Sequence, residues 1–488
     1  MKLTIKIHIL ATLTAISLAL ASCGKETVVR EELPQIFPDY IGVTVPAGIA
    51  PLNFDLPEEY SKVYARVTDN NGNCITAKGS YAGFNVNEWH KLTEANAGGT
   101  LYVTVAGYKD GRWEQFLPFM IFISRYPLED YGVTYRKFAP GYETYSKIGI
   151  YQRNIYNFKE EPIVEGTLLP GQCMGCHTAN ATSPDEFLFH LRGKHGATVV
   201  QKDGERKWLE TKTDRTIGRT AYSYWHPSGD YITHSNNLVH QLFWTGNNDR
   251  YIEVYDDASD VIVHDVDNDE FILSPNLMTE DFETYPAFSS DGKTLFFCSA
   301  PKVQVPAQAQ DLHYNLCAVS FDAQTGTVGH QVDTLIYASK MGKSVTMPRP
   351  SYDGKWILYS YADFGCFPIN HKESDLWLLD LEDGSTHPLQ RANSAYCESF
   401  HNWSSDSHWI LFASRRGDNL YSRIYISEID DEGNASKPFL LPQKDPSFYH
   451  KTLFTFNVPD FTKGKVKFKT SAAYKEAFSD KRTHLTVK

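Results

Sequence analysis

Four copies of one short hairpin pattern recur between residues 224 and 414, and this internal repeat constrains the fold of the 488-residue chain most strongly. Each copy is an apolar strand, a tight turn rich in Ser, Asp and Gly, and a second strand rich in aromatic residues. Gly229, Asp291, Asp353 and Asp406 mark the turns and lie 62, 62 and 53 residues apart. Asp-Gly between two apolar strands is a strong hairpin signal. Two more strands fit between successive markers, and four strands per repeat are typical of a β-propeller blade.

The repeat resembles that of TolB-type propellers: Pro, a variable residue, an aromatic residue and Ser precede x-Asp-Gly-Lys and an alternating strand. The copies at Asp291 and Asp353 match this pattern well, and the copies at Trp225 and Trp403 are degenerate. The resemblance covers roughly residues 144–460 and implies closure with six blades. A sandwich array with chance Asp-Gly turns is the alternative. Strands for the remaining blades are expected near residues 148–157, 198–210 and 449–461.

The first 22 residues are predicted to be a cleavable export signal. Two lysines precede a mostly apolar run from Ile9 to Leu20, which is shorter than the about 20 residues that span a bilayer. The residues up to Cys23 resemble the bacterial lipobox, in which this cysteine is acylated and begins the mature chain. The resemblance implies an outer-membrane lipoprotein facing the periplasm or the cell surface, held by its acyl chains. An ordinary signal peptide is the alternative.

The expected fold class is all-β, because aromatic residues make up 14% of the chain and favour strands. The formal net charge of −12 argues against a nucleic-acid partner. An oxidising compartment permits disulfides, and Cys298 with Cys317 and Cys366 with Cys397 are candidate pairs. The expected organisation is a lipidated tether at 23–37, a small Ig-like β-sandwich at 38–126, a linker at 127–143, a propeller at 144–462 with a short helical insertion at 168–196, and a C-terminal tail at 463–488.

Cys173-Met174-Gly175-Cys176-His177 is the attachment signature of c-type haem. Two thiols at this spacing reach the two vinyl groups of one porphyrin edge, and the histidine then ligates the iron. The chain's composition predicts about 0.005 chance occurrences of this pattern. One covalent haem per chain is therefore expected. The alternatives are a zinc site formed by both cysteines with His190 and His195, or a disulfide between the two cysteines.

A helix is predicted after this motif. Ser183 at the N-cap, Pro184, Glu186 and the closing Gly193 form a helix-start and helix-stop pattern. Such a helix would place His190 on an apolar face with Phe187 and Leu191, as a candidate sixth iron ligand. His195, a distant His or Met, and an open position are the alternatives. Arg192 is a candidate partner of a haem propionate.

These features lead to an electron-transfer or redox-sensing haem lipoprotein, with the propeller as docking platform for an envelope protein or redox partner. Catalysis is expected only if the sixth iron position is open, as in a peroxidase. A second hypothesis is a non-catalytic envelope scaffold in which C-x-x-C-H is structural. A third is a glycan-binding or glycan-cleaving surface protein.

Overall fold

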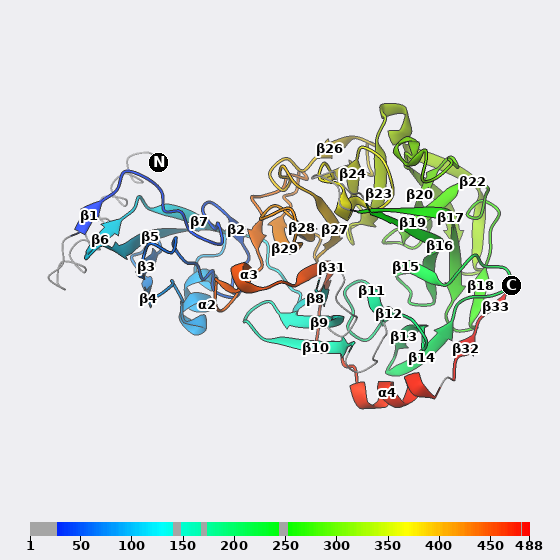
Figure 1. Cartoon of the computed structure of the whole chain (residues 1–488), viewed down its shortest axis with the longest axis horizontal. Coiled ribbons are helices and arrows are strands. Elements are labelled where there is room, and N and C mark those ends of the chain that lie inside the picture. The colour runs from blue at the N-terminus through cyan, green and yellow to red at the C-terminus, as the bar shows by residue number, and fades with distance from the viewer. Residues whose placement is uncertain (1–26, 140–147, 167–172, 244–251, 480) are drawn as a thin grey trace.

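The computed structural model describes residues 27–139, 148–166, 173–243, 252–479 and 481–488. This part of the chain is an N-terminal sheet joined to six sheets arranged around one axis (Figure 1). The expected all-β class and six-bladed propeller are therefore confirmed. Among the described residues, no helix has the length and apolar character needed to cross a membrane. The predicted export signal and Cys23 lie outside the described residues.

The N-terminal region is one hydrogen-bonded sheet of seven strands. Its central strand, β5 (Thr100–Lys109), pairs with β3 (Lys62–Thr68) on one side and with β6 (Arg112–Gln115) and β7 (Phe119–Ile123) on the other. The described residues form no second, facing sheet here, so the expected sandwich is not confirmed. The end of the expected tether also enters this sheet, because β1 pairs with β6. The remaining strands are β1 (Thr27–Val29), β2 (Thr44–Val45) and β4 (Cys74–Gly79).

Helix α2 (Val86–Glu94) covers this sheet instead of a second sheet. It begins at Asn85, whose Oδ1 accepts hydrogen bonds from the backbone N–H groups of Asn87 and Glu88. Trp89 and Leu92 are buried in the same apolar cluster as the inward side chains of β3 and β5. The helix therefore buries the apolar face that a sheet of this size cannot leave in water.

Each propeller blade is a four-stranded antiparallel sheet, numbered here by its position in the chain. The strands of each blade are given from the inner strand outward. Blade 1 contains β31 (Thr455–Thr462), β8 (Gly132–Phe138), β9 (Ile148–Asn154) and β10 (Glu160–Glu165). Blade 2 contains β11 (Cys173–Ala179), β12 (Phe187–Arg192), β13 (Ala197–Lys202) and β14 (Glu205–Glu210). Blade 3 contains β15 (Thr220–Trp225), β16 (Tyr231–Phe243), β17 (Ile252–Asp265) and β18 (Glu270–Ile272).

The other three blades follow in chain order. Blade 4 contains β19 (Phe282–Phe288), β20 (Thr294–Ala300), β21 (Asn315–Asp322) and β22 (Thr327–Ile336). Blade 5 contains β23 (Ser344–Pro350), β24 (Trp356–Ala362), β25 (Asp375–Asp380) and β26 (Thr386–Pro388). Blade 6 contains β27 (Glu398–Trp403), β28 (Trp409–Ser414), β29 (Arg423–Glu428) and β30 (Phe439–Leu440).

The ring closes because blade 1 combines strands from both ends of the propeller sequence. Strand β31, near the C-terminus, pairs with β8 in register from Thr455 opposite Phe138 to Thr462 opposite Gly132. The stretch 127–143, expected to be a linker, therefore supplies a strand of the closing blade. Because strands from both ends of the propeller sequence pair within one blade, the ring is held closed by backbone hydrogen bonds.

The repeated Ser-x-Asp turn has one hydrogen-bonding pattern in three blades. In blade 4 the Ser289 hydroxyl donates to Asp291 Oδ1 at 2.7 Å and accepts from the Thr294 N–H at 3.0 Å. The turns at Ser351 and Ser404 repeat both contacts. The side chains thus satisfy backbone groups at the tip of each hairpin, which is why Ser and Asp recur there.

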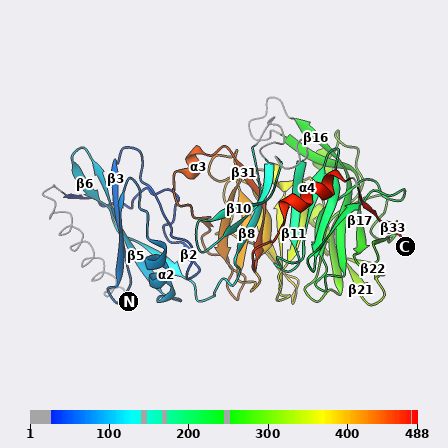
Figure 2. The same cartoon turned by 90° about the horizontal axis from the view of Figure 1, so that it is seen from below.

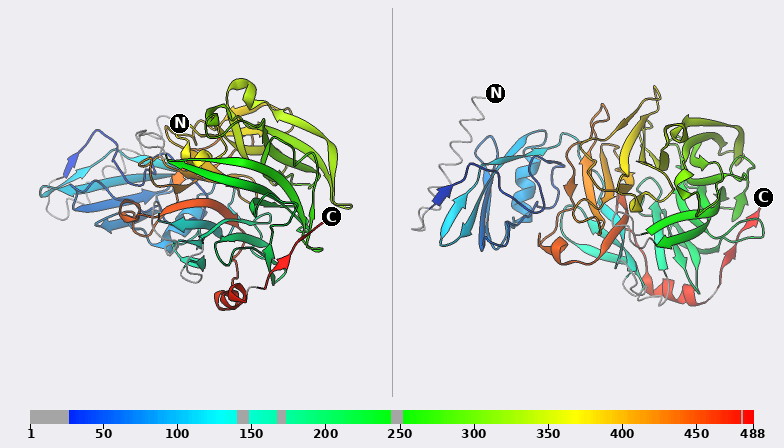
Figure 3. Two further views of the ribbon diagram at one scale, coloured as in Figure 1. Left: turned by 45° about the vertical axis from the view of Figure 1, so that its right-hand side comes forward. Right: turned by 45° about the horizontal axis from the view of Figure 1, so that its top comes forward.

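The C-terminal tail extends two blades on their outer edges. Strand β32 (Thr483–His484) adds in parallel to β14, and β33 (Thr486–Val487) adds to β18. Helix α4 (Thr470–Phe478) lies on the outside of the propeller (Figure 3), and its Glu476 pairs with Arg206 of blade 2. The residues expected to form a tail are therefore a structural part of blades 2 and 3.

The N-terminal sheet and the propeller share one apolar core. The cluster that contains the inward residues of β3 and β5 continues through Trp409 and Ile426 of blade 6. Tyr40 donates a hydrogen bond to the Leu440 carbonyl at 3.2 Å, and the Asn53 side chain donates to the Gln443 and Lys444 carbonyls. The two lobes are therefore packed against each other rather than tethered by a free linker.

Candidate functional site at the propeller axis

All six inner strands contain a β-bulge at the same place. At each bulge the register with the neighbouring strand shifts, and one residue adopts a left-handed backbone with φ between 43° and 55°. A bulge redirects the following side chains, and conserved bulges often lie beside functional sites. The six bulge residues are Cys176, Tyr222, Tyr285, Met347, Phe400 and Val458.

Two residues after each bulge, the inner strands present side chains to the propeller axis. Arg349 of blade 5 stacks on the ring of Tyr224 of blade 3, with the guanidinium carbon 5.3 Å from the ring centroid. Blade 4 separates these two blades, so their side chains meet across the axis. Asn402 of blade 6 donates to Asp460 of blade 1 at 2.7 Å. We call the six equivalent residues the axial ring: Thr178, Tyr224, Ala287, Arg349, Asn402 and Asp460.

The axial ring brings acidic and basic groups together in a partly buried setting. Asp460 is buried and also accepts the Ala179 N–H at 3.2 Å. Burial raises the pKa of Asp460 to about 7, against the opposing effect of that hydrogen bond. Burial also raises the pKa of Tyr224 to about 12. Asp130, which accepts the Ser405 N–H nearby, has its pKa raised to about 6, again mainly by burial.

A long hairpin covers the opposite end of the axis. Strands β16 and β17 run beyond the other strands of blade 3 (Figure 2) and reach the loop between β24 and β25 in blade 5. Glu253 of the hairpin contacts His371 Nε2 at 3.1 Å, and Glu373 contacts His371 Nδ1 at 3.1 Å. Burial lowers the pKa of His371, but the hydrogen bonds to both carboxylates outweigh it and raise the pKa to about 9. The ion pairs of His371 with Glu253 and Glu373 therefore link the long hairpin of blade 3 to blade 5.

The C-x-x-C-H motif is the inner strand of blade 2 rather than part of a helical insertion. Cys173 packs in the apolar cluster between blades 1 and 2, where Arg136 Nη2 lies 3.6 Å from its sulfur. Cys176 is a bulge residue and lies beside Tyr222 of blade 3. The pKa of Tyr222 is raised, mainly by burial and to a smaller extent by the nearby Cys176 thiol. His177 is 2% exposed, and its Nε2 is hydrogen-bonded to Thr134 Oγ1 of blade 1 at 3.0 Å.

The helix predicted after the motif is wrong, because this segment is strand β12. Its residues are buried on both faces from Phe187 to Leu191, between β11 on one side and β13 on the other. A short apolar run between turn residues fits a fully buried strand as well as a helix, and the i, i+3, i+4 spacing could not separate them. The Ser183-Pro184 pair belongs to the hairpin turn before the strand, where the Ser183 N–H donates to the Asn180 carbonyl.

The other predicted haem residues lie apart from one another. His190 uses both ring nitrogens, bonding Thr198 Oγ1 at 2.9 Å and Ser223 Oγ at 3.0 Å, and burial lowers its pKa to about 3. His195 packs against Phe478 of α4, with ring centroids 4.7 Å apart and the ring planes tilted by 47°. Arg192 is exposed at the end of β12, opposite Cys173 in the strand register.

The folded motif does not fit a covalently bound haem. Attachment needs both thiols at one porphyrin edge and a histidine nitrogen free to face the iron. Here Cys173 lies against blade 1 and Cys176 lies beside blade 3, so the two thiols face different neighbours. Thr134 is bonded to His177 Nε2, the nitrogen farther from the backbone, whereas His177 Nδ1 is buried without a partner among the described residues. Among the described residues, no group of three or more His, Cys, Asp or Glu side chains is placed to hold a metal ion through protein ligands alone. All seven cysteines in the described ranges are unpaired, so neither candidate disulfide pair is formed there.

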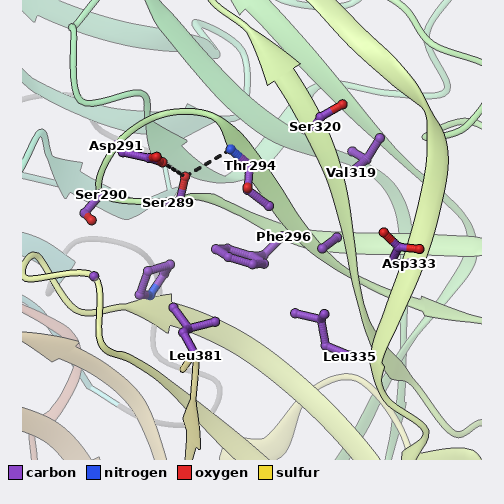
Figure 4. Close-up of a pocket in the computed structure, with 13 residues that line it drawn as sticks. Ser289, Ser290, Asp291, Thr294, Phe296, Val319, Ser320, Asp333, Leu335 and Leu381 are labelled. Carbon is purple, nitrogen blue, oxygen red and sulfur yellow. Dashed lines mark hydrogen bonds between the residues drawn. The ribbon is translucent and has the colours of Figure 1, made fainter. Parts of the chain in front are cut away.

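A surface groove of about 640 Å³ lies between blades 4 and 5. Its floor is apolar, formed by Phe296, Val319, Leu335 and Leu381, while the Ser289–Asp291 turn and Asp333 form its rim (Figure 4). On the rim, Ser289 and Asp291 are bonded within their own turn, as the dashed contacts to Ser289 show, and Asp333 accepts from Gln331. The groove therefore has an apolar floor but few unbonded polar groups that could orient a ligand.

Sequence reasoning did not find the axial ring. Its residues occupy the position just before the repeat's large apolar residue, for example Tyr224 before Trp225 and Asn402 before Trp403. Across the repeats this position varies among Tyr, Ala, Arg, Asn, Asp and Thr, while the residue that follows it is always apolar. A variable and mostly polar position directly before an apolar residue is the signal that could have identified the ring.

No protein-family model matches the chain, and no curated protein matches it. Among solved structures, TolB from Acinetobacter baumannii is similar over 75% of this chain and 80% of its own, with 11% identity and a TM-score of 0.44. An oligogalacturonate lyase in complex with manganese aligns over 64% of this chain and 74% of its own, with 12% identity and a TM-score of 0.34. A puromycin hydrolase aligns over 63% of this chain and 45% of its own, with 11% identity and a TM-score of 0.36. Likenesses this low carry no information on activity, and the strand pairing of the chain itself establishes the six-bladed architecture.

Proposed function

We propose that this protein is a non-catalytic binding protein of the bacterial cell envelope that holds its ligand at the axial ring. The single observation that carries the proposal is that polar and aromatic side chains from four blades meet near the axis, Arg349 with Tyr224 and Asn402 with Asp460. These four residues come from blades 5, 3, 6 and 1. Polar groups converging on a rigid scaffold are the usual form of a small-molecule site.

The two ends of the axis differ in a way that favours binding at the ring. At the end of the axis where the inner strands begin, the β16–β17 hairpin is held against blade 5 by the Glu253–His371 ion pair. The axial ring lies where the inner strands end, and Thr178, Tyr224 and Arg349 are partly exposed there. A ligand that approaches along the axis therefore meets the ring first.

The envelope location rests on the N-terminal sequence, which lies outside the described residues. The lipobox-like residues before Cys23 support acylation of that cysteine and attachment to the outer membrane. We expect the full-length protein to fractionate with membranes and a Cys23→Ala variant to be released or to remain unprocessed. A variant that is processed and membrane-bound like the wild type would contradict this part of the proposal.

A redox function with one covalent haem is the competing candidate, and the C-x-x-C-H sequence is the observation that favours it. Such a haem would supply one-electron chemistry, with Cys173 and Cys176 holding it and His177 below the iron. The positions of these side chains in the folded blade do not fit that group, as described above. Binding at the axis therefore agrees better with the structure.

The proposal can be tested on residues 24–488, the chain without its signal and Cys23, with a panel of amino acids, short peptides, sugars and sugar acids. Thermal shift identifies binders, and hydrogen exchange locates them. We expect at least one compound class to stabilise the protein and to slow exchange in β15, β23, β27 and β31. Protection confined to the groove between blades 4 and 5, or no stabilising compound, would refute binding at the axis.

A further inference from the structure

The guanidinium of Arg349 has unused hydrogen-bonding capacity. One of its N–H groups donates to the Pro348 carbonyl at 3.1 Å, and one face stacks on Tyr224. Within the described residues it forms no ion pair, although Asp and Glu outnumber Lys and Arg by 59 to 47 in the chain. A guanidinium has five donors, so several remain for a ligand.

The acid of the axial ring, Asp460, forms no ion pair with this arginine, although the charge of Arg349 partly opposes the rise in the pKa of Asp460. Asp460 is engaged by the Asn402 side chain and the Ala179 N–H. Its pKa is raised to about 7, chiefly by burial, so near neutral pH a large share of this carboxyl is uncharged. A protonated carboxyl can also donate a hydrogen bond.

Two phenols add further donors at the same place. Tyr352, in the hairpin turn of blade 5, is close enough to Tyr224, Asp460 and Arg349 to interact with each electrostatically. The described residues provide no hydrogen-bond partner for the hydroxyl of Tyr224 or of Tyr352. Arg349 and the two phenol hydroxyls can therefore all donate to an anionic ligand. Asp130 Oδ1, which is buried and has no hydrogen-bond partner among the described residues, is an unused acceptor close to them.

The geometry points to a carboxylate: we propose that the axial ring binds the carboxylate of a small organic acid, with Arg349 as the bidentate donor and the Tyr224 and Tyr352 hydroxyls beside it. This inference rests on the proposed function and names its ligand class. The planar fork of arginine matches a carboxylate. A phosphate dianion fits less well, since the ring has a single cation and the buried acids Asp460 and Asp130 lie close by.

Matched probe pairs test the inference on the wild-type protein by isothermal titration calorimetry. One pair is an N-acetyl dipeptide as free acid and as C-terminal amide; the other is glucuronate and methyl glucoside. We expect at least one acid to bind about tenfold or more tightly than its neutral partner, because charge-assisted hydrogen bonds are the stronger ones. The pair that shows the difference identifies a peptide or a sugar acid as the source of the carboxylate. Equal binding within both pairs, or tighter binding of inorganic phosphate, would overturn the inference.

Variants then assign the effect to the residue. Arg349→Gln should weaken the acid about tenfold or more while leaving the neutral partner unchanged, and Arg349→Lys should restore only part of the affinity. Arg219→Gln is the matched control, since Arg219 lies on the inner-strand side of blade 3 but pairs with Glu210. If neutral compounds protect the inner strands and acids do not, the carboxylate assignment fails and axial binding stands. If no compound protects them, both fail.

Discussion

The inner strands of blades 2 and 6 have the same order of cysteine and histidine but different residues at the bulge. In blade 2, Cys173 and His177 flank Cys176; in blade 6, Cys397 and His401 flank Phe400. Each histidine is buried and bonds the preceding blade. His177 bonds Thr134 of blade 1, and His401 Nε2 donates to the Met347 and Leu358 carbonyls of blade 5.

In both blades, the histidine that follows the bulge residue links its blade to the preceding one by a hydrogen bond. The chance estimate of about 0.005 for C-x-x-C-H treats its residues as independent. The repeat removes that independence, because the same fold position favours a buried histidine in two blades. Among the cysteines and histidines of the two strands, only Cys176 has no counterpart in blade 6, and the bulge position it occupies also accepts Tyr, Met, Phe and Val.

The largest effect is expected for His401→Ala. This change leaves two buried carbonyls without their donor and opens a cavity, so it should lower the free energy of unfolding by about 2–4 kcal/mol. Urea unfolding followed by circular dichroism measures the loss. His330→Ala, at an exposed site on β22, is the control and should change stability by less than about 0.5 kcal/mol.

His177→Ala should have a similar but smaller effect, about 1–3 kcal/mol, because its partner is a single hydroxyl that can reorient. The measurement uses protein made without haem, so that any loss reflects the fold alone. An unchanged unfolding midpoint would show that His177 does not stabilise the fold as His401 does. His177 would then again be a candidate ligand of a haem iron.

The same pair of histidines should make the protein sensitive to acid. Burial lowers the pKa of both His177 and His401 to about 3, so they stay neutral in the fold while the unfolded chain is protonated below about pH 6.5. Their contribution to stability is therefore full above pH 6.5 and falls as the pH drops toward 3. Each should add up to about 1.4 kcal/mol per pH unit to the slope in that range.

Unfolding free energies measured from pH 7 to pH 4 test this slope. In a His177→Asn, His401→Asn double variant the slope should be shallower than in the wild type. Parallel slopes for the two proteins would mean that these histidines are not buried as neutral groups.

The smallest effect is expected for Cys176→Ala, which removes a partly exposed sulfur from a position that varies between blades. We expect a loss below about 1 kcal/mol. Cys397→Ala sharpens the contrast, because that thiol is buried and donates to the Pro368 carbonyl at 3.1 Å. It should cost about 1–2 kcal/mol. A reversed order would show that Cys176 has a structural role that the comparison misses.

The repeat predicted most of the propeller because hairpin turns are local. The turn signals rich in Ser, Asp and Gly placed four blades. The strands expected near residues 148–157, 198–210 and 449–461 are present as β9, as β13 with β14, and as β31. Closure through β8 was missed, since pairing between Thr134 and Asp460 depends on residues more than 300 positions apart. No local pattern encodes such a contact.

Blade 2 was misread as a helical insertion for a related reason. Its hairpin turn has Ser183-Pro184 in place of Asp-Gly, and its strands are apolar on both faces, so neither turn chemistry nor alternation marks it. The axial ring was missed because residues that meet across the axis, such as Arg349 and Tyr224, are 125 positions apart. The motif was visible in sequence, whereas the orientation of its side chains depends on the bulge.

The most direct test of this account is the reduced pyridine haemochrome spectrum of the mature chain, expressed with an export signal in a host that attaches c-type haem. The account predicts well-folded protein with no c-type α-band, and the same result for Cys176→Ala. A band at one haem per chain in the wild type, lost in Cys176→Ala, would contradict it and make the inner strand of blade 2 a haem site.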